Sequence, residues 1–277
     1  MKIAFNILPV ITDYDHVHLL IEAGDYGISF IWFTKDPCIL YGLAVYNQTE
    51  RILPGDVAVE IEKIFQAAPI FNKRCASVNV CYDFKESLLI PAEYYSPSSS
   101  EKMLNLVYAS GEESSFRSDT LKKQAGYNIY AIHKKIEQVI NTKFPMASFQ
   151  HATTMQLDKM EGGVVDMHCI FFHNSIKIFL FKDSQLQIVQ QFNYTTPVDA
   201  SYHLLNCCER HDVKPAEVKL LLSGMIDERS GLYNELYKYF LDIGFEATDP
   251  GIELHDRIRF YPAHFFSHLT ALALCVS

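Results

Sequence analysis

Two stretches of this chain alternate apolar and polar residues at the period of a β-strand, and both follow one pattern. The first covers residues 18–46 and the second covers residues 166–194. Turn residues divide each stretch into three parts, so each predicts a meander of three strands. Lys35-Asp36 in the first stretch corresponds to Lys182-Asp183 in the second. A repeat of this length predicts two related subdomains rather than a solenoid, because solenoid periods are much shorter.

Each meander is followed by a helical pattern, a further β-like run and a second helix. The expected ranges are 56–68, 76–82 and 99–109 in the first half, and 198–211, 218–222 and 231–241 in the second. Alternating strands and helices add parallel strands beside each meander. The prediction is therefore an α/β fold of two tandem subdomains, each a mixed five-stranded sheet with flanking helices.

A linking region separates the two halves. It predicts a short strand at 128–132 and a helix at 133–142, whereas 110–119 is expected to be an exposed loop. The polar, glycine-rich segment 158–163 is the best candidate for a domain junction. We therefore expect an N-terminal subdomain at 1–157 and a C-terminal subdomain at 158–277.

Composition excludes several classes of partner. The 277 residues carry a formal net charge of -9 and show no basic patch, which argues against nucleic acid and against an anionic membrane surface. No stretch approaches the roughly 18 apolar residues that a membrane span needs. The amino-terminal residues do not resemble a targeting signal. We therefore expect a cytoplasmic protein with no membrane span.

The seven cysteines predict reduced, mostly buried thiols. Their number is odd and no C-x-x-C motif occurs, so neither a disulfide framework nor a zinc site is indicated. His264 and His268 are spaced for one face of a helix, but the intervening residues lack the glutamate of a zinc protease. We expect no metal site.

The duplicated β-β-β-α-β-α order resembles the ribonuclease-H-like fold shared by actin, sugar kinases and heat-shock ATPases. The second half resembles bacterial actin-like assembly proteins such as the pilus protein PilM and the division protein FtsA. The chain also resembles an uncharacterised bacterial domain-of-unknown-function family with this architecture. The resemblance covers nearly the whole chain but depends on short motifs.

The resemblance implies a phosphate-binding turn in the hairpin that opens each half. The usual pattern is Asp-x-Gly, in which the glycine admits phosphate to the backbone and the carboxylate holds hydrated Mg²⁺. In the first hairpin Glu22, Gly24, Asp25 and Gly27 occupy this region, which keeps an anion site conceivable. Tyr26 stands where the family has small residues.

The second hairpin departs further from the pattern. Its Asp position falls on Ile170 and its Gly position on Phe172. The other register places Asp166 and His168 in these positions, which is little better. An apolar residue cannot hold a hydrated metal ion, so we expect this turn to be inactive.

A third family motif, a strand that ends in Gly-Gly and contacts adenosine, is half kept. Ser223 and Gly224 match its small residue and first glycine, and Met225 replaces the second glycine. We assign Glu22, Gly24, Asp25, Gly27, Ser223 and Gly224 to a residual nucleotide site, with no catalytic residues.

These observations predict a non-catalytic or weakly nucleotide-binding protein that acts through a protein partner. No cofactor is required in this interpretation, and a homo-oligomer is left open. The alternative is an active ATPase or kinase, binding ATP and magnesium, that uses Glu22 and Asp25 in a divergent phosphate site. A third hypothesis, a small-molecule hydrolase, would need a deep polar pocket away from these residues.

Overall fold

A computed structural model of the protein describes residues 1–48, 53–108 and 111–276. Its contacts divide the chain into two units. Unit 1 contains Met1–Lys159, Gly251–Ile258 and the segment from Leu272 onward, and unit 2 contains Met160–Pro250 and Arg259–Ala271. The boundary predicted after residue 157 lies beside the division between Lys159 and Met160, and two short carboxy-terminal segments belong to unit 1.

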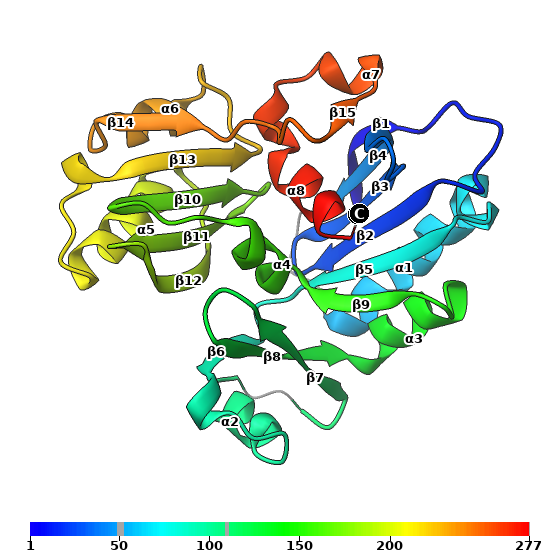
Figure 1. The fold of residues 1–277 in the computed structure, drawn as a ribbon, viewed down its shortest axis with the longest axis horizontal. Coiled ribbons are helices and arrows are strands. Elements are labelled where there is room, and N and C mark those ends of the chain that lie inside the picture. Colours follow the sequence, from blue (N-terminus) through cyan, green and yellow to red (C-terminus); the bar gives the residue numbers. More distant parts are fainter. Residues whose placement is uncertain (49–52, 109–110, 277) are drawn as a thin grey trace. The chain divides into compact units, whose positions relative to one another are not determined.

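Unit 1 is built on a seven-stranded sheet with the order β1-β4-β3-β2-β5-β9, with β15 also paired to β4 (Figure 1). Its strands are β1 (Lys2–Ile7), β2 (His18–Gly24), β3 (Gly27–Phe33), β4 (Ile39–Asn47), β5 (Ser77–Asp83), β9 (Ser148–His151) and β15 (Glu253–Leu254). The meander β2-β3-β4 is antiparallel, and β5 runs parallel to β2. The predicted five strands were too few, because β1 and β15 join the sheet through pairing between segments remote in sequence.

Helices cover the sheet of unit 1. They are α1 (Pro54–Ala67), α3 (Lys134–Lys143) and α4 (Ala152–Lys159), with the 3₁₀ turn η1 (Pro69–Asn72). The short helix α7 (Asp256–Arg259) follows β15. Proline at the first position suits the start of α1, because that backbone nitrogen needs no helical partner. Phe30 and Trp32 of β3 pack against Phe65 of α1 and Phe71 of η1 in the core.

A smaller sheet is inserted between β5 and β9. It has the order β6-β8-β7 and comprises β6 (Ser87–Pro91), β7 (Ser114–Leu121) and β8 (Gly126–His133), with η2 (Ala92–Tyr94) and α2 (Ser100–Val107). The predicted strand and helix of the linking region are confirmed as β8 and α3. The loop predicted at 110–119 was wrong for the residues that form β7. A polar edge strand lacks the apolar pattern by which strands are recognised in a sequence. Ala109 and Ser110 lie outside the described residues.

Unit 2 repeats the strand order of unit 1. Its sheet has the order β12-β11-β10-β13-β14, the counterpart of β4-β3-β2-β5-β9. The elements are β10 (Val165–Phe171), β11 (Ser175–Lys182), β12 (Gln185–Asn193), β13 (Lys219–Gly224), β14 (Asp242–Phe245), α5 (Pro197–Arg210), η3 (Pro215–Glu217), α6 (Gly231–Leu236) and η4 (Ala263–Phe265). Helix α8 (Ser267–Cys275) begins in unit 2, and its residues from Leu272 onward belong to unit 1. The five-stranded prediction is confirmed for this half.

The helices of unit 1 that correspond to α5 and α6 of unit 2 are not both the predicted ones. α5 follows its meander as α1 does, and it begins with a capping box between Thr196 and Asp199. α3 precedes β9 and packs on α1, as α6 precedes β14 and packs on α5. α3 is therefore the second helix of the first repeat, and the prediction that residues 99–109 take this place was wrong.

Candidate functional site

The four candidate residues of the first half lie at the turn between β2 and β3. Gly24 pairs with Gly27 across the hairpin, and Asp25 and Tyr26 form its tip. Glu22 lies on β2 with 5% of its surface exposed. The ends of the parallel strands β2 and β5 meet at this turn, where Gly24 faces Asp83.

Asp25 lies among other carboxyl groups at this turn. Its Oδ2 accepts a hydrogen bond of 3.0 Å from the backbone N–H of Lys85. Burial raises the pKa of Asp25 to about 6, and the nearby carboxylates of Glu86 and Asp83 contribute to the increase. The turn therefore concentrates negative charge at the position where the resemblance implies a phosphate group.

The raised pKa of Asp25 predicts that Asp25→Asn stabilises the protein near neutral pH. The folded state binds this proton more tightly than the unfolded chain, so the stabilising contribution is full below about pH 4 and is lost as pH rises through 6. Asparagine keeps an oxygen that accepts from Lys85. We expect a gain of about 1 kcal/mol at pH 7.5, a rise in Tm of about 2–4 °C, that disappears at pH 4.

Thermal melts of Asp25→Asn and the unmodified protein at pH 4, 6 and 7.5 check this prediction. Asp15→Asn, at an exposed position in the loop before β2, is the matched control and should change little at any of these pH values. A gain in Tm that is the same at all three pH values would refute the assigned role of the Asp25 carboxylate.

The corresponding turn in unit 2 carries the aromatic side chain of Phe172 and is closed by hydrogen bonds. Phe172 donates its backbone N–H to the carbonyl of Ser175 at 2.8 Å, and its own carbonyl accepts from the Tyr194 hydroxyl at 3.2 Å. The Phe172 ring contacts the His268 ring edge-on, with centroids 5.8 Å apart. Ile170 is 1% exposed within β10. The backbone groups of Phe172 are thus already bonded within the protein.

Ser223 and Gly224 end strand β13 in unit 2, whereas the other four candidates belong to unit 1. The Ser223 hydroxyl is buried and donates a long hydrogen bond of 3.4 Å to the carbonyl of Cys169. Gly224 pairs with Phe171 of β10. Both residues thus have structural roles in their sheet, and a contact with nucleotide stays a prediction.

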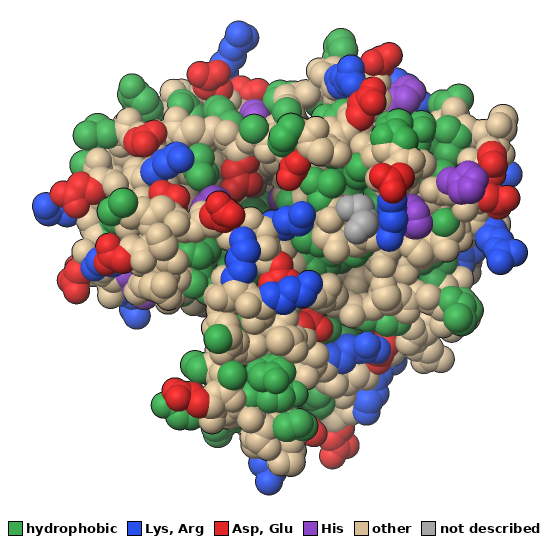
Figure 2. All heavy atoms as spheres, in the orientation of Figure 1, with side chains coloured by type: hydrophobic (Ala, Val, Ile, Leu, Met, Phe, Trp, Pro, Cys, Tyr) green, Lys and Arg blue, Asp and Glu red, His purple; other side chains and the backbone are tan. Residues whose placement is uncertain are grey.

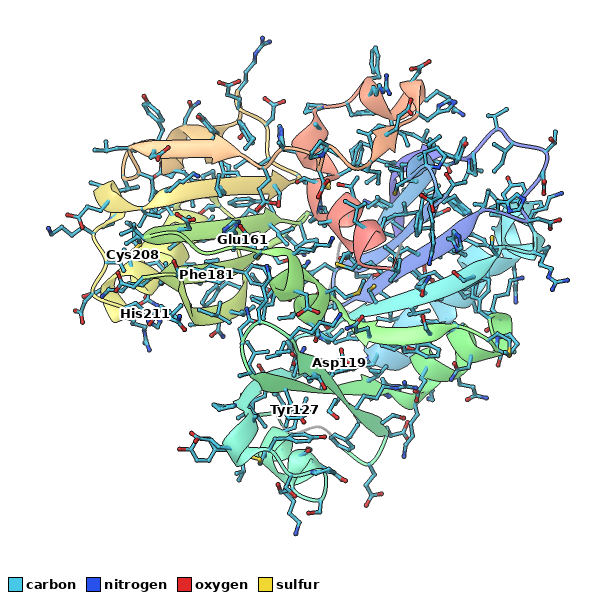
Figure 3. The ribbon with its side chains drawn as sticks, in the orientation of Figure 1. Asp119, Tyr127, Glu161, Phe181, Cys208 and His211 are labelled. Carbon is cyan, nitrogen blue, oxygen red and sulfur yellow. The ribbon has the colours of Figure 1, made fainter. Side chains whose placement is uncertain are left out.

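A buried polar network that sequence reasoning missed connects the small sheet of unit 1 with β9 and α4. Asp119 of β7, labelled in Figure 3, accepts hydrogen bonds from the His151 backbone N–H, the Thr154 hydroxyl and the Tyr130 hydroxyl. Asn128 of β8 donates to Thr154 in turn. Burial raises the pKa of Asp119, although the donors oppose this change. Such a bonded network holds elements together, and the sequence, in which 110–119 was expected to be a loop, gave no signal for it.

The cysteines are free thiols, as predicted. Cys207 and Cys208 of α5 lie in the core of unit 2, and Cys208 is labelled in Figure 3. Burial raises the pKa of Cys207 to about 11 and that of Cys208 to about 12. Thiols with such raised pKa values are poor nucleophiles at neutral pH.

The spacing of His264 and His268 does not place them on one helix. His264 lies in η4, and its Nε2 donates to the carbonyl of Ile226 at 2.8 Å, whereas His268 lies in α8. No group of three or more metal-ligating side chains occurs in residues 1–48, 53–108 and 111–276. Within the same residues, no helix has the length and apolar character that would let it cross a bilayer.

Comparison with solved structures shows that the fold is that of the actin-like ATPases. A Bacteroides thetaiotaomicron protein of unknown function with this fold is 19% identical, with a TM-score of 0.72, and the match covers 95% of this chain and 99% of that chain. The PilM–PilN type IV pilus biogenesis complex matches at 12% identity and a TM-score of 0.62, covering 94% and 98%. The resemblance to the actin-like fold and to PilM is thus confirmed.

Sequence comparisons identify the family. No curated protein matches the chain. The model of one family, described as a protein of unknown function (DUF3822), matches residues 11–243. This match covers most of both repeats, including the two hairpin turns and the Ser223-Gly224 segment. The chain belongs to the DUF3822 family.

Proposed function

We propose that this protein is a non-catalytic actin-like protein that acts through contacts with another protein and does not hydrolyse ATP. The proposal is supported by the side chains that occupy the protein's two hairpin turns. Carboxyl groups crowd the β2–β3 turn, and the Phe172 side chain packs at the β10–β11 turn.

An ATP phosphate chain does not fit the groups at these turns. Phosphoryl transfer needs positive charge and free donors around the phosphates, because its transition state gathers negative charge on oxygen. At the first turn Asp25, Asp83 and Glu86 add negative charge, which the Lys85 ammonium offsets only in part, and the Lys85 backbone N–H already donates to Asp25. At the second turn Phe172 supplies no polar side chain, and its N–H is bonded to Ser175.

An exposed apolar surface supports the protein-contact part of the proposal. Figure 2 shows hydrophobic side chains gathered over the part of unit 1 that contains α2 and the three-stranded sheet. Leu106 of α2 is 87% exposed, and Val107 of α2 and Tyr94 of η2 are also exposed. Exposed apolar groups that gather in this way are typical of protein-binding surfaces. The fold is compatible with such a role, since PilM is found in a complex with PilN.

We also propose a cytoplasmic location, because free thiols suit a reducing compartment. The partner is then another cytoplasmic protein or the cytoplasmic part of one.

Phosphate release from ATP and Mg²⁺ tests the catalytic half of the proposal. We expect the purified protein to release phosphate no faster than buffer alone, and Glu22→Gln to give the same result. Glu22 is the matched substitution because the alternative, an active ATPase, assigns the metal-holding role to this carboxylate. Release well above buffer that falls about tenfold or more in Glu22→Gln would overturn the proposal in favour of that alternative.

A further inference from the structure

Strand β12 forms an open edge of the sheet in unit 2. It pairs with β11 alone, and no other strand of the described chain lies against its second side (Figure 1). Its sequence, QLQIVQQFN, has no charged residue and no proline over nine positions. Such an edge presents unpaired backbone groups that can pair with another strand.

The other sheet edges of the described chain are blunted in ways that β12 is not. β1 carries Lys2, β7 carries Arg117 and β6 ends in Pro91. β9 and β14 have only four residues each, and β14 includes Asp242. Charges, prolines and short lengths are among the usual devices against edge-to-edge pairing, and β12 has none of these three.

The β11–β12 ladder shows which backbone groups of β12 point outward. Tyr194 donates its N–H to the carbonyl of Asn174, so these two residues form a hydrogen-bonded pair. Hydrogen-bonded and non-hydrogen-bonded pairs alternate along an antiparallel ladder. The register is continuous from Tyr194 back to Ile188. The backbone groups of Val189 and Gln191 therefore point away from β11.

The open part of the edge has defined limits. Beyond Gln191, the carbonyl of Asn193 already accepts from His203 Nε2 of α5 at 3.1 Å. Before Val189, the ladder is interrupted between Ile188 and Leu186, which leaves Gln187 as the extra residue of a β-bulge. Val189 and Gln191 are thus the residues whose outward groups lie in regular strand geometry.

The residues around Gln190 are self-complementary. If two copies of β12 pair antiparallel about a two-fold axis at Gln190, Val189 of each copy lies opposite Gln191 of the other. Ile188 then lies opposite Phe192, so side chains that pack on the core of unit 2 meet across the axis. Gln190, which is exposed, meets its own copy, and an amide can donate to and accept from an identical amide.

We propose that the protein self-associates through β12, with a second copy of the chain paired antiparallel about Gln190. No like charges meet in this arrangement, and it uses the outward backbone groups that the ladder leaves open. The proposal is independent of whether ATP binds and concerns a surface different from that of α2.

Charge reversal at Gln190 tests the proposal in the full chain. Sedimentation equilibrium of the unmodified protein should show a mass that rises from 31.7 kDa toward twice that value as its concentration approaches about 200 µM. Gln190→Lys and Gln190→Glu should each weaken association about tenfold or more, because like charges meet at the axis. An equimolar mixture of the two variants should restore association, because opposite charges then meet.

Gln185→Lys is the matched control, since Gln185 is exposed on the same strand but lies outside the paired run. It should associate as the unmodified protein does, and far-UV circular dichroism should show that all variants are folded. A constant monomer mass for the unmodified protein would overturn the proposal. So would association of either Gln190 variant at unmodified strength, or a mixture that stays monomeric.

Discussion

Replacing Gly27 with alanine is expected to destabilise unit 1 by about 3 kcal/mol or more. Gly27 begins β3 with a φ angle of 147°, which side-chain-bearing residues rarely adopt. A Cβ at this position would lie 2.0 Å from the carbonyl oxygen of Tyr46 on the neighbouring strand. That oxygen belongs to the backbone of β4, so relief requires the two strands to separate locally.

Trp32 provides the measurement for this prediction. It is the single tryptophan of the chain and is fully buried in unit 1, so its fluorescence reports the unfolding of this unit. The urea midpoint of the fluorescence change should fall strongly in Gly27→Ala. Gly55→Ala is the control, because a Cβ there meets only the flexible Lys135 side chain at 3.6 Å, and alanine favours a helix. Equal midpoints for Gly27→Ala and the unmodified protein would contradict the prediction.

Gly224→Ala is expected to have an effect of similar size in unit 2, a loss of about 3 kcal/mol and a fall in Tm of about 10 °C. Gly224 has a φ angle of 80°, and a Cβ would lie 2.2 Å from the carbonyl oxygen of Phe171. β10 and β13 are paired at this point, so the carbonyl cannot move without disturbing the sheet. The glycine is thus required by the backbone whether or not a nucleotide is bound.

Thermal unfolding followed by circular dichroism measures this effect. Gly231→Ala is the matched control in the same unit, since a Cβ there meets nothing within 4 Å and the residue begins helix α6. We expect its Tm to stay within about 2 °C of the unmodified value. If Gly224→Ala and Gly231→Ala had the same Tm, the prediction would be wrong, because the close contact with Phe171 would then not destabilise the protein.

The sequence was sufficient to predict the meander of each repeat and the helix that follows it. The two meanders are continuous apolar and alternating runs between clear turns, and the helices α1 and α5 follow them in both halves. This information is local, since strand period and turn residues lie within a few positions of one another. These local patterns therefore predicted the α/β class and the repeat of three strands followed by a helix.

Other parts of the fold depend on pairing between distant segments. β1 and β15 join β4 from near the two ends of the chain, and no local pattern records such pairing. Polar residues lie on both faces of β7, so its sequence suits a loop as well as a strand. These elements account for the two extra strands of unit 1 and for the missed insertion.

The candidate site was predicted in part. The turn residues Gly24 to Gly27 and the apolar Phe172 could be read directly from the two hairpins. The acidic neighbours Asp83 and Glu86 come from the end of β5 and the residues after it, and only the parallel pairing of β2 with β5 brings them to Asp25. The concentration of negative charge at this turn was therefore visible only in three dimensions.

The central claim is that the two hairpin turns no longer hold the phosphates of a nucleotide. Its most direct test is a thermal melt of the full chain with and without about 5 mM ATP and Mg²⁺, because a ligand that binds only the folded state raises Tm by mass action. We predict a Tm within about 1 °C of the nucleotide-free protein. A saturable rise in Tm with ATP that Glu22→Gln abolishes would contradict the claim.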